Sequence, residues 1–263
     1  MIRVGVFGAG GRMGSTVCAA VAGDPELELV AAVDPFHGGI DLRQLGIPDT
    51  GLQVARAAEA MLDAGADVAV DFTVLDAARD NLYWCADNGI HAVVGTTGFT
   101  DHDLADLASR FDVSPANALI APNFAIGAVL MMRFAELAAP YFETAEVIEL
   151  HHDEKIDAPS GTAMLTASRM AAASSDWAED PTQKVVVEGA RGGEGPGGIR
   201  VHSLRLRGLV AHQEVVLGTT GQSLTVRHDS YDRTSFMPGV LLAIRGVRDH
   251  PGLTVGLDSF LTG

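Results

Sequence analysis

The sequence IRVGVFGAGGRMG, residues 2–14, joins a short apolar run to a glycine-rich turn. The run at residues 2–7 predicts a buried strand, and a helical pattern follows over residues 13–22. Gly8 allows a tight turn, and Gly10 lets the backbone come close to a pyrophosphate. This order of strand, glycine turn and helix is typical of the first unit of a dinucleotide-binding fold.

A second apolar segment, at residues 29–33, predicts the next buried strand and ends at Asp34. Asp34 lies 20 positions beyond Gly14, where a carboxylate can accept hydrogen bonds from the ribose hydroxyls of an adenosine. Gly11 gives the turn additional conformational freedom, and Gly14 lets the helix lie close to the sheet. The flanking elements favour dinucleotide binding over the alternative, a glycine-rich turn in some other α/β protein.

The alternation of strand and helix continues to about residue 122. The predicted elements are strands at residues 68–72, 91–94 and 118–121 and helices at residues 75–88 and 100–110, the last with a loose capping box. Such spacing predicts a parallel sheet covered by helices on both faces. Ligands of these sheets bind beyond the carboxyl ends of the strands. The turns at residues 71–73, 95–97 and 121–124 are therefore expected to line one cofactor cleft.

The stretch ELHHDEKIDAPSGTA, residues 149–163, carries the candidate chemistry. A predicted strand before it delivers His151 and His152 to a loop that holds Lys155, and a predicted helix follows it. The N–H groups at a helix start lack intrahelical partners and attract anions. Proton donors beside such a start predict a site for a carboxylate substrate. The alternative is a set of polar residues in a surface loop.

The pattern changes in the second half of the chain. We expect a long helix at residues 123–139, strands at 184–187, 199–204, 206–210, 213–217 and 223–228, and a closing helix at 234–247 whose tail returns to the first domain. The predicted fold class is α/β: a Rossmann-like domain at residues 1–122 and 231–263, plus an α+β domain at residues 123–230 with an open mixed sheet. An open sheet face favours pairing between copies, so a homo-oligomer is expected.

Composition excludes several classes of protein. The 263 residues carry a formal charge of −16, which argues against a nucleic-acid or acidic membrane surface as partner. Cys18 and Cys85 make no disulfide framework, no apolar run is long enough to span a bilayer, and no leader is evident, so the cytoplasm is expected. No His, Cys or Asp cluster predicts a metal site. Other histidines, such as His37, are expected to be surface or core residues.

Together these residues resemble one family, the 4-hydroxy-tetrahydrodipicolinate (dihydrodipicolinate) reductases of bacterial lysine and diaminopimelate synthesis. The resemblance rests on GAGGRMG at residues 8–14, DFT at 71–73, GTTG at 95–98, APNF at 121–124 and, above all, ELHHDEKIDAPSGTA at 149–163. It runs from the first strand to the closing helix. It implies an NAD(P)H-dependent reduction of a cyclic unsaturated dicarboxylate by a homotetramer assembled through its second-domain sheets.

The resemblance also implies roles for single residues. His151 and Lys155 correspond to the catalytic acids, and His152, Ser160, Gly161 and Thr162 to substrate contacts. The implied cofactor-binding residues are Gly8, Ala9, Gly10, Gly11, Arg12 and Met13 around the pyrophosphate, Asp34 at the ribose, and Gly95, Thr96, Thr97, Ala121, Pro122, Asn123 and Phe124 near the nicotinamide. Which of His151 and His152 gives the proton stays open.

Cofactor choice and reaction class have alternatives. Many relatives place an arginine after the ribose-binding acid, whereas Pro35 follows Asp34, which favours NADH; Arg12 could still reach a 2′-phosphate. One alternative is another two-domain reductase of imines or aldehydes. A phosphorylating aldehyde dehydrogenase would need a nucleophilic cysteine in the second domain, and both cysteines lie in the first. Another alternative is a dinucleotide-sensing protein without catalysis.

Overall fold

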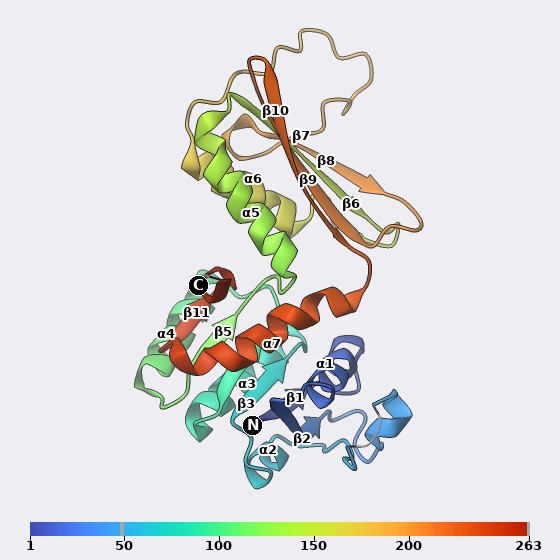
Figure 1. Cartoon of the computed structure of the whole chain (residues 1–263), viewed down its shortest axis with the longest axis vertical. Coiled ribbons are helices and arrows are strands. Elements are labelled where there is room, and N and C mark those ends of the chain that lie inside the picture. The colour runs from blue at the N-terminus through green and yellow to red at the C-terminus, as the bar shows by residue number, and fades with distance from the viewer. Residues whose placement is uncertain (48–49, 262–263) are drawn as a thin grey trace. The chain divides into compact units, whose positions relative to one another are not determined.

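A computed structural model describes residues 1–47 and 50–261 of the chain. The chain forms two compact units, Met1–Phe124 with Phe236–Gly263 and Ala125–Ser235 (Figure 1). None of the helices in the described residues is both long and apolar enough to cross a membrane. Short 3-10 helices lie at Leu42–Leu45, Ala139–Tyr141, Pro196–Gly198, Arg233–Phe236, Val247–Asp249 and Asp258–Leu261.

The first unit is built on a parallel sheet, which confirms the Rossmann-like fold expected for this part of the chain. Its six strands run in the order β11-β5-β4-β3-β1-β2, and every pair is parallel. The strands are β1 (Ile2–Phe7), β2 (Leu27–Val33), β3 (Val68–Asp71), β4 (His91–Val94), β5 (Ala118–Ile120) and β11 (Leu253–Val255). The helices are α1 (Arg12–Ala22), α2 (Glu59–Asp63), α3 (Leu75–Asn88), α4 (Asp101–Val113) and α7 (Met237–Gly246).

Burial explains why these runs form strands. All four residues of β3 are buried, and so are the last four of β1, as expected for a sheet packed on both faces. Thr100 caps α4 in a full capping box with Asp103, as its sequence predicts. The tail after α7 returns to this sheet, because β11 pairs in parallel with β5.

The second unit has a mixed, open sheet, also as predicted. Its strands are β6 (Thr144–His151), β7 (Gly193–Glu194), β8 (Arg200–Arg205), β9 (Ala211–Thr219) and β10 (Gln222–Ser230), in the order β10-β9-β6-β8-β7. Only β6 and β8 pair in parallel. Helices α5 (Ile126–Ala138) and α6 (Gly161–Ala173) cover one face (Figure 1) and pack on Val147, Val201 and Val215.

Several local predictions for this unit were wrong. Residues 184–187 form no strand: Val185, Val186 and Val187 are exposed, and β7 takes the sheet edge instead. A β-branched run forms a strand only where it can pack and pair, and this one does neither. Residues 206–210 form the turn between β8 and β9, where Gly208 has a φ of 88°.

Candidate active site

The glycine turn joins β1 to α1 at the carboxyl end of the first sheet. The N–H of Ala9 donates to Val33 O at 3.2 Å, and that of Gly11 donates to Gly8 O at 2.9 Å, so the turn is tied to β2 and to itself. Gly11 caps α1 without a side-chain hydrogen bond, which leaves the N–H groups of the first helical turn open to an anion. A Cβ on Gly14 would lie 2.0 Å from Gly8 O. The turn therefore has the geometry of a phosphate cradle.

Asp34 follows β2 and is 4% exposed. Its Oδ1 accepts the N–H groups of Phe36 and His37 and lies 3.0 Å from His37 Nδ1, while Oδ2 accepts the N–H of Gly10 at 3.1 Å. Burial alone would raise the pKa of Asp34, but the bonds from His37 and the backbone outweigh it and lower this pKa. The ionised Oδ2 keeps acceptor capacity for a ribose hydroxyl.

The structure places Arg56 against Pro35, the residue after this acid, which sequence reasoning missed. Its Nη1 donates to Pro35 O at 3.1 Å, and its side chain packs over Gly38. A bridge between Val33 and Ala55 brings the two segments together, so no local signal could have revealed the contact. His37, expected to be an ordinary surface or core residue, lies against Asp34 and Gly10. Arg12 is exposed.

A hollow of about 190 Å³ lies at the carboxyl ends of β3, β4 and β5. Its lining residues are Met13, Phe72, Gly95, Pro122, Asn123, Phe124 and Phe236. All of these except Phe72 and Phe236 are among the cofactor-binding residues implied by the family resemblance. A Cβ on Gly95 would lie 2.0 Å from the Phe72 ring, so only glycine fits there. The rings of Phe72 and Phe124 are 5.5 Å apart and form an apolar wall suited to a flat ring such as nicotinamide.

Other residues predicted at this edge support the hollow and are absent from its lining. Ala121 is fully buried, and its N–H donates to Val94 O at 2.9 Å. Thr96 is buried, and its Oγ1 donates to Thr73 O at 3.0 Å. Asp71, in a turn expected to line the cofactor cleft, is buried instead: it accepts both the N–H and the Oγ1 of Thr73, and burial raises the pKa of its carboxyl. Thr97 is exposed.

In the second unit, His151 is the last residue of β6 and not a loop residue. Glu149, two residues earlier, lies on the same strand face and is fully buried. Its Oε2 is 2.5 Å from His151 Nδ1. Arg205 of β8 pairs in register with His151, and its Nη1 and Nη2 donate to the two oxygens of Glu149 at 2.8 and 2.7 Å. These three side chains form one charged cluster under the strand end.

The cluster shifts two pKa values. Burial would raise the pKa of Glu149, but the hydrogen bonds from Arg205, Ser203 and His151 lower it overall, so the carboxylate stays ionised. Burial lowers the pKa of the His151 imidazole, and Lys155 and Arg205 lower it further, while the bond to Glu149 acts in the opposite direction. His151 is therefore a histidine whose protonation depends on its carboxylate neighbour.

The start of α6 lies in the same stretch. Ser160 is buried, its Oγ caps the N–H of Ala163 at 3.2 Å, and its own N–H donates to Glu149 Oε1 at 3.2 Å. Met164 donates to Ser160 O, which leaves the N–H groups of Gly161 and Thr162, the first two helical residues, for an external acceptor. Ser160 thus shapes the helix start from its buried side, and the N–H groups of the next two residues are open to an anion.

Lys155 is already engaged. Its Nζ donates to the two carboxylate oxygens of Asp157 at 2.7 and 2.8 Å, a contact that was not predicted from the sequence. His152 is exposed. Glu149 was visible in the sequence as an acid two positions before His151, whereas Arg205 comes from a strand 54 positions later and carried no signal. Within the described residues, no group of three or more His, Cys, Asp or Glu side chains could hold a metal ion.

Neither cysteine fits a nucleophile. Cys18 in α1 and Cys85 in α3 are both buried, and burial raises the pKa of Cys18 to about 12. Burial also raises the pKa of Cys85.

Comparison with known proteins agrees with this architecture. An amine dehydrogenase from Mycobacterium smegmatis has a TM-score of 0.69 and 16% identity, covering 98% of this chain and 95% of that one. At this low identity the match shows a shared fold only. A dipicolinate-bound dihydrodipicolinate reductase from Paenisporosarcina sp. TG-14 has a TM-score of 0.88 and 41% identity, covering 99% of this chain and 100% of that one.

Curated sequences extend the match. The 4-hydroxy-tetrahydrodipicolinate reductases of Corynebacterium urealyticum and Cutibacterium acnes are 50% and 51% identical, each over 99% of both chains. The family models for the N-terminus and C-terminus of dihydrodipicolinate reductase match residues 2–124 and 127–261. The chain is therefore a member of the dihydrodipicolinate reductase family.

Proposed function

We propose that this chain reduces 4-hydroxy-tetrahydrodipicolinate to tetrahydrodipicolinate with NADH or NADPH, in the synthesis of diaminopimelate and lysine. The observation that carries the proposal is the grouping of His151, Lys155 and the open start of α6 in one stretch of a family member. The bound dipicolinate of the Paenisporosarcina relative, a cyclic dicarboxylate, supports the substrate class. In this proposal the first unit binds the cofactor and the second binds the substrate.

The proposed substrate carries two carboxylates and needs two anion seats. The N–H groups of Gly161 and Thr162, with the Thr162 hydroxyl, supply one seat at the positive end of α6. Lys155 supplies the positive charge for the other, with His152 beside it. Because Asp157 now holds the Lys155 ammonium at 2.7 Å, a substrate carboxylate would compete with an exposed aspartate for this cation. Ser160 keeps the helix start in place from its buried position.

Reduction of the ring requires a hydride and a proton. The nicotinamide cofactor, when bound, supplies the hydride. The residues of the glycine turn, Asp34 and the hollow beside Phe72 fit such a group, because they offer open N–H groups, a ribose acceptor and an apolar wall. His151 gives the proton to the anionic ring, and the Lys155 charge stabilises that anion before protonation.

Turnover with both cofactors tests the function and the cofactor choice together. We expect NADH to be oxidised when the condensation product of pyruvate and aspartate semialdehyde is generated in place, with kcat/KM about tenfold above that for NADPH. The ionised Asp34 repels a 2′-phosphate, although Arg56 beside Pro35 could partly offset this repulsion. Loss of absorbance at the nicotinamide band gives the rates.

Two variants serve as controls on that preference. Asp34→Asn removes the repelling charge and should raise the relative use of NADPH, whereas Arg56→Ala should lower it. A parent enzyme that clearly prefers NADPH would contradict the proposed cofactor choice. Cofactor binding without oxidation of either nucleotide would favour the alternative of a dinucleotide-sensing protein.

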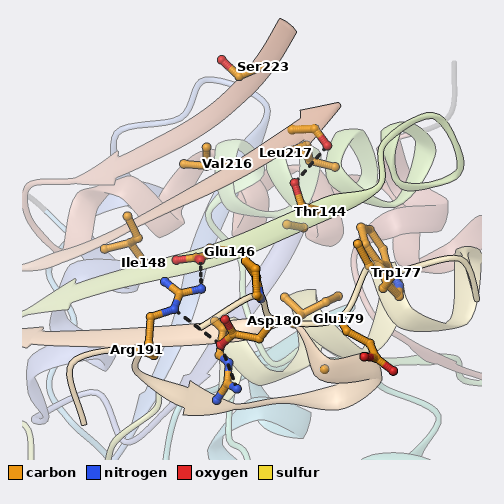
Figure 2. A pocket seen from close by; sticks show the side chains of 17 residues that line it. Thr144, Glu146, Ile148, Trp177, Glu179, Asp180, Arg191, Val216, Leu217 and Ser223 are labelled. Atoms are coloured by element: carbon orange, nitrogen blue, oxygen red, sulfur yellow. Dashed lines mark hydrogen bonds and ion pairs between the residues drawn. The ribbon is translucent and has the colours of Figure 1, made fainter. Parts of the chain in front are cut away.

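The uncovered face of the second sheet supports a homotetramer. It presents Ile148 and Val216, both half-buried, together with Glu146. A hollow of about 530 Å³ on this face contains none of the predicted substrate residues. Figure 2 shows Arg191 between Glu146 and Asp180 at this hollow. We propose that another copy of the chain covers this face.

Light scattering tests that assembly. We expect a mass about four times the 27.5 kDa of one chain at micromolar concentration. Replacing Ile148 by aspartate, which puts an unpaired charge on the uncovered face, should lower the mass. A parent protein that is monomeric at this concentration would rule the assembly out.

A further inference from the structure

We propose that Glu149, itself held in place by Arg205, is a positioning residue that fixes the tautomer of His151 and directs its Nε2 at the substrate. The proposal rests on the proposed function, in which His151 gives the proton. Three residues that bond to one buried carboxylate, His151, Arg205 and Ser160, carry it.

The contact between Glu149 and His151 fixes which imidazole nitrogen carries the proton. Oε2 of Glu149 lies 2.5 Å from His151 Nδ1, within hydrogen-bond distance, and an ionised carboxylate can only accept. Nδ1 must therefore carry the proton in this contact. The ring is held from behind, and in the neutral imidazole Nε2 is the free acceptor; in the imidazolium it is the second donor. A side chain fixed in this way loses little freedom when the substrate binds.

Arg205 keeps the buried Glu149 carboxylate ionised. A carboxyl with no exposed surface would normally bind a proton and could then no longer orient a histidine by accepting from it. Arg205 prevents this with two parallel N–H bonds of 2.7 and 2.8 Å, the bidentate geometry that guanidinium and carboxylate share. The order of action is therefore from Arg205 to Glu149 to His151.

The Glu149 carboxylate also holds the residue that precedes α6. Oε1 of the same carboxylate accepts the N–H of Ser160 at 3.2 Å, one residue before α6 begins. Arg205 Nη2 also donates to the carbonyl of Asp157, the residue that holds Lys155. The Glu149 carboxylate thus sets the relative positions of the His151 imidazole and the start of α6. A substrate whose carboxylate binds at α6 is thereby positioned next to His151, the proton donor.

The proton transfer follows from this arrangement. The Nε2–H bond of the imidazolium breaks, its electron pair stays on Nε2, and the proton forms a new bond to the anionic ring. The Nδ1–H bond stays intact and donates to Glu149 throughout, and a second proton, taken up from solvent, binds Nε2 afterwards. The charged groups that act on His151 are Glu149 on its own strand, Arg205 on β8 and Lys155 in the following loop, with Asp157 behind Lys155.

Nitrogen-15 NMR of the substrate-free parent enzyme tests the tautomer directly, with signals assigned by comparison with His151→Gln. We expect His151 to be protonated at Nδ1 and unprotonated at Nε2 above its titration midpoint. Nε2–H as the main neutral form would overturn the proposal. Because this readout needs no turnover, it stands or falls separately from the proposed reaction.

Glu149→Gln tests the effect on rate. We expect kcat to fall about 100-fold, within the range that a general acid contributes. We also expect the alkaline limb of the kcat/KM profile to move to lower pH, because the carboxylate that favours imidazolium is gone. A merely structural role would lower the amount of active protein and leave that limb in place.

Glu146→Gln is the matched control. Glu146 lies on the same strand and also accepts from an arginine and a histidine, Arg191 and His202, but it has no contact with His151. We expect its pH profile to match that of the parent. An unmoved alkaline limb in Glu149→Gln, or an equal shift in both variants, would refute the positioning role.

Discussion

Lys155→Ala is expected to lower kcat at least about 100-fold while dinucleotide affinity stays within twofold of the parent. A cation beside the developing ring anion acts mainly in the transition state, and removing one such donor typically costs this much. The protein should fold normally, because the only described bonds of the Lys155 ammonium are to Asp157, which is more than half exposed and stays hydrated without it. Steady-state kinetics and calorimetric titration with NADH measure the two quantities.

His151→Ala is expected to show the same pattern, because it removes the proton donor but leaves the first unit untouched. Lys184→Ala and His102→Ala are the matched controls, since both residues are exposed and lie outside the candidate site. Near-normal turnover in Lys155→Ala or His151→Ala would show that the assigned roles are wrong. Loss of activity in the controls as well would indicate that the assay reports folding.

Gly14→Ala has the second large expected effect, on stability and cofactor binding together. A Cβ at this position would lie 2.0 Å from Gly8 O and 2.6 Å from Gly8 C, so a rigid backbone and not a side chain must move. Overpacking of this kind costs about 3 kcal/mol. Moving α1 away from the turn also spoils the phosphate cradle, so NADH affinity should fall at least tenfold.

Calorimetry can measure both consequences of Gly14→Ala. A loss of about 3 kcal/mol should lower Tm by about 10 °C. Gly23→Ala is the control at the other end of α1, where the added Cβ would lie at an ordinary contact distance of 3.4 Å from Ala19 O. A Gly14→Ala protein with parent stability and parent NADH affinity would mean that α1 does not need this close approach.

Local patterns in the sequence predicted most of the fold. The apolar runs that end at Phe7, Val33 and Val94 are strands of one parallel sheet, because a strand buried on both faces must be apolar throughout. The valine run at residues 185–187, within the predicted strand 184–187, has the same local character but stays exposed. Its failure shows that propensity alone does not make a strand where the sheet edge is already occupied.

The candidate site was predictable in part for a related reason. His151, Lys155 and Ser160 lie within ten positions, so one strand end, one loop and one helix start must bring them near each other. Met13, Gly95 and Asn123 come from separate turns, yet they meet because parallel strands end at the same edge. No local sequence pattern predicted that Arg205 or Arg56 would lie at the site, because pairing between segments far apart in the chain brings them there.

The sequence by itself determined the element types, the glycine turn, the acid after β2 and the residues able to carry charge and protons, because these depend on contacts between near neighbours. Only the tertiary structure decided which charges act on which proton donors. Strand register set Arg205 against Glu149 and thereby the state of His151, and a bridge between distant segments set Arg56 beside Pro35. The interaction between two charges depends on their distance in space. For residues far apart in the sequence, that distance is known only once the chain has folded.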